Sequence, residues 1–332
     1  YVRWTENRNM MEYLRLLDTG IVALDRIISS EYAIEDVSQA FDSFNSSPKP
    51  LMVLLTYPHD EPALSPLAPV DRLVSIRTAP VRRKGQITVG LVGTGNFAVA
   101  MHLPILQKLS ASYRLHGVMS RTGLKAKEIA EKSGAAYATT SFQELLNDKE
   151  IDLVLISTRH DSHADLTLEA LRSGKNVFVE KPLATNSADL ARIRHFYEEE
   201  STPDKRPLLM VGFNRRFSCY AREIKKHLER RVSPAFIRYR MNAGFAPADS
   251  WVHDDGGRII GEACHIIDLM TFLTGSRIVS ANSSCVEFSG AKFASQDNRS
   301  ITLKYEDGSL CLIDYFSVGN PLLPKEYMEV HF

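Results

Sequence analysis

Several features that would assign a chain to a specialised class are missing from this sequence. Its 332 residues carry a formal net charge of +0, so no excess charge indicates nucleic acid or a charged membrane surface as a partner. The sequence has no long uncharged apolar run and no signal-type N-terminus. We therefore expect a cytoplasmic protein without a transmembrane helix.

Cysteine is also scarce and widely spaced. The four cysteines form no C-x-x-C pair, and they are Cys219, Cys264, Cys285 and Cys311. This spacing indicates neither a disulfide framework nor a zinc site, so we expect buried thiols and no metal.

The composition that remains is typical of a globular protein. Hydrophobic residues make up 44% of the chain and charged residues 24%, and the length suggests about two domains. Residue 1 is tyrosine, and the last five residues, 328–332, resemble a strand that is cut short. We expect both ends to belong to larger folds.

The strongest pattern begins at residue 86. Ile87–Val92 is a short apolar run that predicts a buried parallel strand, and a G-x-G-x-x-A turn follows it. A strand, a glycine turn and a helix in this order form the dinucleotide-binding fingerprint. Gly93 permits the tight turn and Gly95 admits a pyrophosphate, while the helix start at Asn96 and Phe97 favours phosphate charge. A glycine turn without a ligand is the alternative.

Strand-like and helix-like segments alternate from residue 86 to 213. This alternation predicts an α/β, Rossmann-type doubly wound parallel sheet. Residues 214–332 contain two helical patterns, 220–231 and 260–273, among strands at 235–241, 278–286, 300–305 and 311–316. Asp307-Gly308 between the last two strands is a hairpin signal. We expect a second α/β domain with a mostly antiparallel sheet, which binds substrate and forms oligomer contacts.

The segment before residue 86 has a different character. Residues 5–17 and 35–44 have helical spacing, and residues 51–57 read as a strand. This 1–57 segment is short for an independent core, so we assign it a structural role. Residues 58–85 are predicted to be a linker, stiffened by four prolines between residues 58 and 69.

The end of the second Rossmann strand bears on the choice of dinucleotide. An acidic residue there would favour NAD, but the strand runs into Ser120 and Arg121. These side chains suit a 2′-phosphate, so we expect NADP in preference to NAD. An arginine at the surface without a ligand is the alternative.

The next two strands also end in polar residues. Thr158, His160 and His163 follow the third strand, and Glu180-Lys181-Pro182 follows the fourth. Ligands of open α/β sheets bind at the carboxyl ends of the strands. We therefore expect Thr158, His160, His163 and Glu180 to contact the cofactor. Pro182 favours a cis peptide bond that would aim the lysine.

Together with further motifs, these residues resemble the Gfo/Idh/MocA family of oxidoreductases. The resemblance rests on the Gly93 turn, Glu180-Lys181-Pro182, the run from Gly212 to Phe217, Trp251 with Gly256-Gly257, and His265-x-x-Asp268. It spans residues 86–332 and implies a Rossmann domain followed by an α/β domain, with a homo-oligomer formed through the open face of the second sheet.

The resemblance also implies a catalytic pair. Lys181 would reach the substrate oxygen, where its charge would stabilise a developing alkoxide. A lysine that only caps the strand end is the alternative. His265 would exchange the proton of the substrate hydroxyl as a general acid or base. A histidine that only holds the two domains together is the alternative.

The sequence departs from the family beside this histidine. The family often has an aspartate four residues before it, where this chain has Gly261. Glu262 and Asp268 each lie three residues from His265 on a helix, so either can be its partner. We assign Glu262 to the catalytic set, and Arg215, Trp251 and Asp268 to substrate binding.

The expected activity is hydride transfer between a nicotinamide and a carbinol carbon of a sugar, sugar derivative or polyol. Several arginines near the expected substrate region favour an acidic or nucleotide-linked sugar, although they can equally pair with surface carboxylates. The alternatives are a dinucleotide-binding regulator without catalysis, which the Gly261 departure favours, and an NAD-dependent glycosidase of the same family.

A second, partial resemblance covers residues 1–57. Trp4–Met10, the helix start Ala33–Val37 and the closing strand resemble the C-terminal end of the catalytic domain of medium-chain alcohol dehydrogenases. That family's cofactor and zinc residues lie upstream and are absent here. The resemblance implies an intact protein that joins two dehydrogenase-like units.

Overall fold

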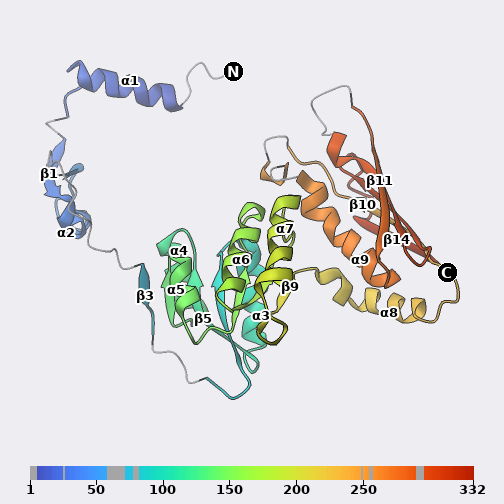
Figure 1. Ribbon diagram of the computed structural model, residues 1–332. Helices are drawn as coiled ribbons and strands as arrows, with labels where there is room; N and C mark the ends of the chain where they lie inside the picture. Colours follow the sequence, from blue (N-terminus) through green and yellow to red (C-terminus); the bar gives the residue numbers. More distant parts are fainter. Residues whose placement is uncertain are drawn as a thin grey trace. The chain divides into compact units, whose positions relative to one another are not determined.

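The computed structural model describes residues 6–24, 27–57, 72–77, 82–247, 250–253, 257–288 and 295–332. The chain divides into two compact units, residues 1–70 and 71–332 (Figure 1). Each unit is described by itself below. Within the described residues, no helix combines the length and the apolar character needed to cross a membrane.

The first unit contains a small β-α-β arrangement. Its elements are α1 (Glu6–Asp18), β1 (Ile28–Ala33), η1 (Ile34–Asp36), α2 (Val37–Ser43) and β2 (Met52–Thr56), and β1 pairs in parallel with β2. Both helical segments and β2 were expected from the sequence, but β1 was not. Serine at positions 29 and 30 hides the apolar alternation that identifies a half-buried strand.

The second unit begins with a seven-stranded sheet in the order β3-β6-β5-β4-β7-β8-β9. The strands are β3 (Leu73–Ser75), β4 (Ile87–Val92), β5 (Tyr113–Met119), β6 (Tyr137–Thr139), β7 (Leu153–Ile156), β8 (Asn176–Val179) and β9 (Leu209–Val211). All neighbours from β6 to β9 pair in parallel, which confirms the predicted doubly wound sheet.

The edge strand β3 corrects one prediction. It pairs antiparallel with β6, although residues 73–75 lie within the segment that the sequence predicted as a linker. The strand is only three residues long, and its recognition depends on the partner strand rather than on its own pattern. Residues 58–71 lie outside the described part of the chain.

Helices cover both faces of this sheet because successive strand residues point to opposite sides. On β4, Leu91 packs with the η2–α3 side and Val92 with the α5–α6 side. The helical elements are η2 (Ala98–His102), α3 (Leu103–Lys108), α4 (Gly123–Ser133), α5 (Phe142–Asn147), η3 (His160–Ser162), α6 (His163–Arg172), α7 (Ser187–His195), η4 (Phe196–Glu200) and η5 (Pro203–Lys205).

The rest of the second unit is built on a five-stranded sheet in the order β11-β12-β13-β10-β14. Its strands are β10 (Phe236–Asn242), β11 (Ile278–Cys285), β12 (Arg299–Tyr305), β13 (Leu310–Phe316) and β14 (Glu326–His331). Only the pair of β10 and β13 is parallel among these described strands, so the predicted mostly antiparallel sheet is confirmed.

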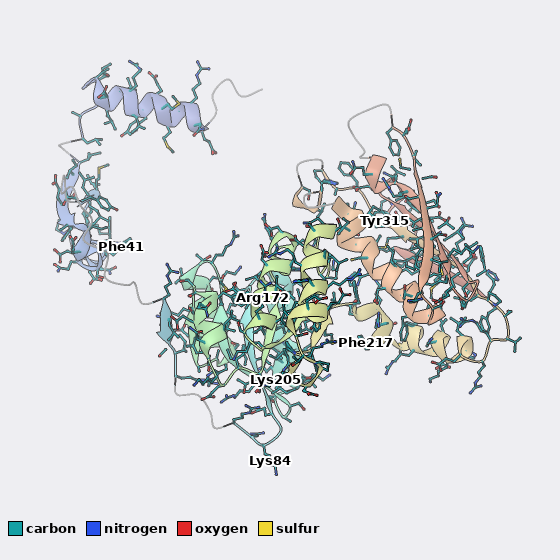
Figure 2. The ribbon with its side chains drawn as sticks, in the orientation of Figure 1. Phe41, Lys84, Arg172, Lys205, Phe217 and Tyr315 are labelled. Atoms are coloured by element: carbon teal, nitrogen blue, oxygen red, sulfur yellow. The ribbon has the colours of Figure 1, made fainter. Side chains whose placement is uncertain are left out.

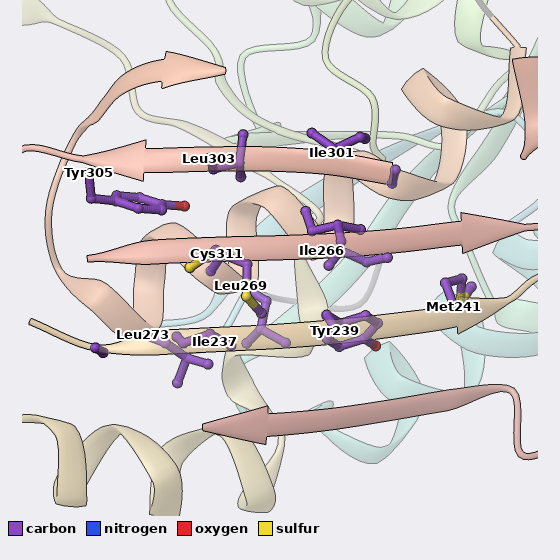
Figure 3. Close-up of a cluster of buried hydrophobic side chains, with 14 of the residues drawn as sticks. Ile237, Tyr239, Met241, Ile266, Leu269, Leu273, Ile301, Leu303, Tyr305 and Cys311 are labelled. Carbon is purple, nitrogen blue, oxygen red and sulfur yellow. The ribbon is translucent and has the colours of Figure 1, made fainter. Parts of the chain in front are cut away.

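One face of this second sheet packs against helices, and α9 lies along it in Figure 1. Figure 3 shows Ile266, Leu269 and Leu273 from α9 against alternate residues of β10, β12 and β13. The helical elements are η6 (Asn214–Phe217), α8 (Cys219–Leu228), η7 (Trp251–His253), η8 (Ile259–Ala263), α9 (Cys264–Thr274) and η9 (Ser295–Asp297). Gly275, in a left-handed conformation, ends α9.

The cysteines correct a second prediction. Cys311 is buried in the second core and Cys264 is partly buried, but Cys219 and Cys285 are exposed. Cys219 begins α8 and Cys285 ends β11, and both positions lie at element ends that the core does not cover.

Candidate active site

The glycine turn joins β4 to η2 and lies against the end of β7. Gly93 has a φ of +95°, and a Cβ there would lie 2.3 Å from the carbonyl oxygen of Ser157. Nothing lies within 4 Å of a Cβ built on Gly95. Gly93 is therefore required by backbone crowding, whereas Gly95 leaves an open approach, as a pyrophosphate requires. Asn96 and Phe97 are exposed at the helix start.

The end of β5 contacts the same turn. The Thr94 hydroxyl donates a hydrogen bond to the Ser120 hydroxyl at 3.0 Å. Arg121 follows directly and is exposed. The structure thus brings Ser120 and the glycine turn together at one edge of the sheet, and the role of Arg121 in choosing NADP stays a prediction.

The turn after β7 has a structural histidine. His163 is fully buried, its Nδ1 lies 2.7 Å from the Pro182 carbonyl oxygen, and its Nε2 lies 3.3 Å from the Thr158 carbonyl oxygen. Burial lowers its pKa. The ring of His163 therefore joins the ends of β7 and β8, and its predicted cofactor contact stays a prediction.

His160 lies in the same turn but is only partly buried. Its Cε1 lies 3.1 Å from the place that a Cβ on Gly261 would occupy. Burial and then the charge of Lys181 lower the pKa of His160 to about 4. Thr158 accepts a hydrogen bond from the Ser162 hydroxyl at 2.8 Å, which closes this turn on itself.

Glu180 has a partner that the sequence did not predict. Its Oε1 lies 2.9 Å from Nε2 of His102, and both side chains are 12% exposed. A Cβ on Gly212 would lie 2.9 Å from the Glu180 carboxylate, so the glycine makes room for that group. No short sequence motif predicts a role for His102. The only signal is its position in the helix that follows the glycine turn.

Lys181 connects the seven-stranded sheet to the helical segment η8. Its Nζ donates a hydrogen bond of 2.8 Å to the carbonyl oxygen of Gly261, in η8. The Lys181–Pro182 peptide bond is cis, as the sequence predicted. A lysine at the end of β8 is therefore held at the start of the helix that carries His265.

His265 lies one turn further along, in α9. Its ring meets Phe213 edge-on with a centroid distance of 6.0 Å. Its Nδ1 is buried without a hydrogen-bond partner among the described residues. Burial, and then the charges of Lys181 and Arg215, lower the pKa of His265 to about 3. The imidazole is therefore neutral at neutral pH.

Neither predicted partner of His265 contacts it. Glu262 Oε2 accepts a hydrogen bond from the Tyr315 hydroxyl at 2.8 Å, and Tyr315 is labelled in Figure 2. Asp268 accepts hydrogen bonds from Arg216, the Nε bond being 2.9 Å. The helix begins with a π-helical turn, η8, and this wider winding changes the angle between Glu262 and His265 that an α-helix would give.

The arginines of the substrate region contact other side chains or carbonyl oxygens, although Arg240 Nε has no hydrogen-bond partner among the described residues. Arg215 donates to the Tyr239 hydroxyl at 2.6 Å and pairs with Glu326, and Tyr239 donates to Glu326 at 2.5 Å. The other four are also engaged: Arg216 with Asp268, Arg238 with Asp314, Arg240 over the Tyr327 ring at 5.3 Å, and Arg258 with the carbonyls of residues 243 and 244. Trp251 begins the short turn η7, and Gly256 lies outside the described residues.

These groups lie near one another. Lys181 and His160 lie against Gly261, and His265, whose pKa the Lys181 charge helps to lower, lies four residues further along the same helical segment. The open position at Gly95 and the unpartnered Nδ1 of His265 fit a dinucleotide and a bound substrate. Such a set can polarise a substrate oxygen and exchange its proton.

Two family models match the second unit. One is described as an oxidoreductase family with an NAD-binding Rossmann fold and matches residues 87–203. The other is the GFO/IDH/MocA C-terminal domain and matches residues 231–331. Residues 1–86 lie outside both matches, and the resemblance of residues 1–57 to alcohol dehydrogenases stays a prediction. The domain bounds 86–213 and 214–332 also stay predictions.

Curated relatives match a similar share of the chain. Inositol 2-dehydrogenase 2 of Saccharopolyspora erythraea is 32% identical over 235 residues, which are 69% of this chain and 66% of that protein. Myo-inositol 2-dehydrogenase of Thermotoga maritima is 26% identical over 231 residues, 68% of this chain and 67% of that protein. The chain thus spans about two thirds of the length of these relatives.

Solved structures share the fold. An NAD-binding protein from Listeria innocua superposes with a TM-score of 0.59 at 26% identity, covering 74% of this chain and 71% of that one. The myo-inositol dehydrogenase of Lactobacillus casei, in complex with NAD(H) and myo-inositol, superposes with a TM-score of 0.60 at 22% identity, covering 70% of this chain and 68% of that one.

Proposed function

This chain belongs to the Gfo/Idh/MocA family of oxidoreductases, and from that premise we propose that it is an NAD(P)-dependent dehydrogenase of a sugar, sugar derivative or polyol. The observation that carries the proposal is the hydrogen bond of 2.8 Å from Lys181 Nζ to the Gly261 carbonyl oxygen. It holds the lysine beside the helix of His265, at the edge of the sheet where the glycine turn lies.

A nicotinamide dinucleotide, when bound, supplies the hydride chemistry at its C4 position. Gly93, Gly95 and the start of η2 would hold its pyrophosphate, and Ser120 with Arg121 would lie toward the adenosine ribose. Asn96, Phe97, Thr158 and Glu180 line the same edge and stay proposed cofactor contacts.

Lys181 is the proposed oxyanion-stabilising group. The Gly261 carbonyl uses one of its three N–H donors, so the others can point at a substrate oxygen. Charge that develops on this oxygen during hydride loss is stabilised by the ammonium in a partly buried site.

His265 is the proposed proton acceptor. Its neutral ring has a nitrogen free to take the hydroxyl proton, which leaves the substrate as a carbonyl compound. Glu262 acts at a distance, because it fixes Tyr315 and Arg258 and not the imidazole. Asp268 acts through Arg216.

The substrate proposal is a neutral polyol in preference to an acidic or nucleotide-linked sugar. Four of the five arginines already have a carboxylate or carbonyl partner, which weakens the reason for a bound carboxylate or phosphate. The fifth, Arg240, packs over the Tyr327 ring, and its Nε has no hydrogen-bond partner among the described residues. The names of two curated relatives, both inositol dehydrogenases, support the same class.

The test is a titration of the purified chain with NADH and NADPH, followed by nicotinamide fluorescence, and then an assay with NAD or NADP and myo-inositol. We expect the chain to bind a dinucleotide and to reduce NAD or NADP when myo-inositol is present. Lys181→Met should abolish this reduction without loss of dinucleotide binding. Dinucleotide binding without turnover of any polyol or sugar would favour the regulator. Sugar cleavage without net change of the dinucleotide would favour the glycosidase.

Residues 1–57 belong to a separate proposal. Their β-α-β arrangement and their resemblance to alcohol dehydrogenases favour an intact protein that joins two dehydrogenase-like units. Sequencing of the complete gene tests this, because the absence of an upstream dehydrogenase domain would refute it. A homo-oligomer and a cytoplasmic location also stay predictions.

A further inference from the structure

We propose that Arg258 is a positioning residue for the proposed reaction: its buried guanidinium fixes the helical segment η8 and, through the Gly261 carbonyl, the position of Lys181. This inference rests on the proposed function and extends it to a residue that acts through the backbone and not on the substrate. The sequence patterns placed Arg258 only among the arginines of the substrate region.

The first anchor of Arg258 is the end of β10. The residue lies at the start of η8, and its side chain is 5% exposed. Its Nη1 donates to the Gly244 carbonyl oxygen at 2.7 Å, and its Nη2 donates to the Ala243 carbonyl oxygen at 3.0 Å. Both carbonyls directly follow β10, which lies between β13 and β14 in the second sheet. The side chain therefore ties the start of η8 to a strand inside that sheet.

The second anchor is Glu262, one turn further along. Nη2 of Arg258 also lies 3.4 Å from Oε1 of Glu262. The other carboxylate oxygen, Oε2, accepts a hydrogen bond of 2.8 Å from the Tyr315 hydroxyl on β13, and the guanidinium lies 5.7 Å from the centre of the Tyr315 ring. Arg258 and Glu262 flank Gly261, whose carbonyl accepts the hydrogen bond of 2.8 Å from Lys181. The network thus holds η8 on both sides of this carbonyl.

Stability alone does not account for this buried charge. The side chains of Arg258 and Asp297 are 5% and 6% exposed, their Nη1 and Oδ2 atoms lie 3.9 Å apart, and Arg258 Nε is buried without a hydrogen-bond partner among the described residues. Apolar side chains of similar size commonly stabilise a core as well as a buried ion pair, because both charges lose their hydration. A guanidinium instead supplies planar donors that reach two carbonyls and a carboxylate at once, which a lysine cannot do.

The position of η8 matters for the reaction because Lys181 is bound to it. A misplacement of a catalytic group by about 1 Å can lower a rate about 100-fold. The glycine turn that would hold the dinucleotide belongs to the other sheet, so a shift of η8 should affect the chemical step more than dinucleotide binding.

The test compares wild type with two variants of Arg258. Arg258→Lys keeps the charge but loses the planar donors, and Arg258→Met loses both. The assay measures kcat and KM for myo-inositol with NAD or NADP, and fluorescence measures NADH affinity. We expect both variants to lower kcat about 10–100-fold and to change KM and NADH affinity less than about threefold.

Arg231→Met is the matched control. The Arg231 side chain is 15% exposed, donates to the carbonyl oxygens of Leu228 and Thr274, and pairs with Asp307. Thr274 ends α9, whereas η8 precedes that helix. Arg231→Met should lower the melting temperature as Arg258→Met does, yet leave kcat within about twofold of wild type, because its contacts are distant from Gly261.

A second readout does not require turnover. After burial, the charge of Lys181 is the next cause of the low pKa of His265, about 3. If Arg258→Lys releases Lys181 from η8, NMR titration of the His265 Cε1 proton should give a higher pKa, still below 6.5 because burial remains. Tyr315→Phe keeps the ring and removes only the hydroxyl that holds Glu262. It should change kcat and this pKa in the same direction but less, and it replaces Arg258→Lys if that variant does not fold.

The outcomes separate the two proposals. A kcat of Arg258→Lys within about twofold of wild type, an equal loss of kcat in Arg231→Met, or an unchanged pKa of His265 would each overturn the role of Arg258 and leave the proposed dehydrogenase intact. If wild type oxidises no polyol or sugar with either dinucleotide, the proposed function fails, while the pKa of His265 still shows whether Arg258 holds Lys181 in place.

Discussion

Nε2 of His102 lies 2.9 Å from Oε1 of Glu180, and this pair joins the first helix after the glycine turn to the end of β8. The His102 ring also meets Phe97 and Phe178 edge-on, at 5.3 and 5.7 Å. The residue before the proposed catalytic lysine is therefore held by the same helix that would bind the cofactor phosphates.

We expect Glu180→Ala to lower the free energy of unfolding by about 1–3 kcal/mol, because the partly buried His102 loses a charged hydrogen-bond partner. Urea denaturation measures this. His102→Ala and the double variant complete a cycle, and the double variant should cost clearly less than the sum of the two. Additive costs would show that the pair does not act as a unit.

The two glycines of the turn should respond differently to alanine. Gly93→Ala is expected to destabilise the protein strongly, because it adds a Cβ at a φ of +95° and 2.3 Å from the Ser157 carbonyl oxygen. Gly95→Ala should leave the melting temperature unchanged, because nothing lies within 4 Å, yet weaken NADH binding. A stable Gly95→Ala protein with full NADH affinity would place the pyrophosphate elsewhere.

Arg121 should decide between the two dinucleotides. We expect Arg121→Ala to weaken NADPH binding by about 10–100-fold, since a charged hydrogen bond to the 2′-phosphate is lost, and to leave NADH binding unchanged. Fluorescence titration measures both. Lys132→Ala is the control, an exposed cation on α4 that pairs with Glu128. Equal weakening of both dinucleotides would remove the preference for NADP.

Glu326 should make stability depend on pH at the acid end. Burial raises the pKa of Glu326, but its hydrogen bonds from Arg215 and Tyr239 and the Arg215 charge outweigh burial, so the pKa lies below the usual 4.5. The folded state therefore binds the proton more weakly than the unfolded state, and its stabilisation is present above pH 4.5 and is lost as pH falls below it. Glu326→Gln should flatten this part of the stability curve in chemical denaturation. An unchanged curve would mean that another carboxylate dominates.

His160 and His265 should make stability depend on pH over a higher range than Glu326 does. The folded-state pKa values are about 4 for His160 and about 3 for His265, against the ordinary 6.5. The unfolded state binds more protons below pH 6.5, so stability is fully present above this value and falls as pH decreases toward 4 and 3. His160→Gln should make the fall between pH 6.5 and 4 shallower. NMR titration of the histidine Cε1 protons checks the pKa values directly, and an ordinary value for His160 would contradict the prediction.

Much of the fold was predictable because its signals are local. The apolar run Ile87–Val92 and the glycine turn define strand and helix within a dozen residues, and the alternation that follows predicts the parallel sheet. The strands β3 and β6 were missed because each has three residues, too few for a period to show. Helix α7 was also missed, since only Ile193 of its residues is buried and the apolar stripe is weak.

The roles of the predicted site residues stay predictions, and the contacts between these residues were not predictable from the sequence. Lys181 and His265 followed from motifs. The choice of Glu262 or Asp268 as partner of His265 was wrong, because Tyr315 from β13 and Arg216 from η6 reach these carboxylates first. His163 has the residue type and position of a ligand contact, and its complete burial and its two backbone carbonyl partners could not be predicted from the sequence.

The strand, the glycine turn and the Glu180-Lys181-Pro182 segment could be recognised from the sequence alone, because each depends on residues that are close along the chain, and the family resemblance followed from several such short motifs. The tertiary structure decided which groups meet. Lys181 and Gly261 are 80 residues apart, and Arg215 and Glu326 are 111 residues apart. Such contacts depend on strand order and on the packing of α9 against the second sheet, and no local pattern encodes that geometry.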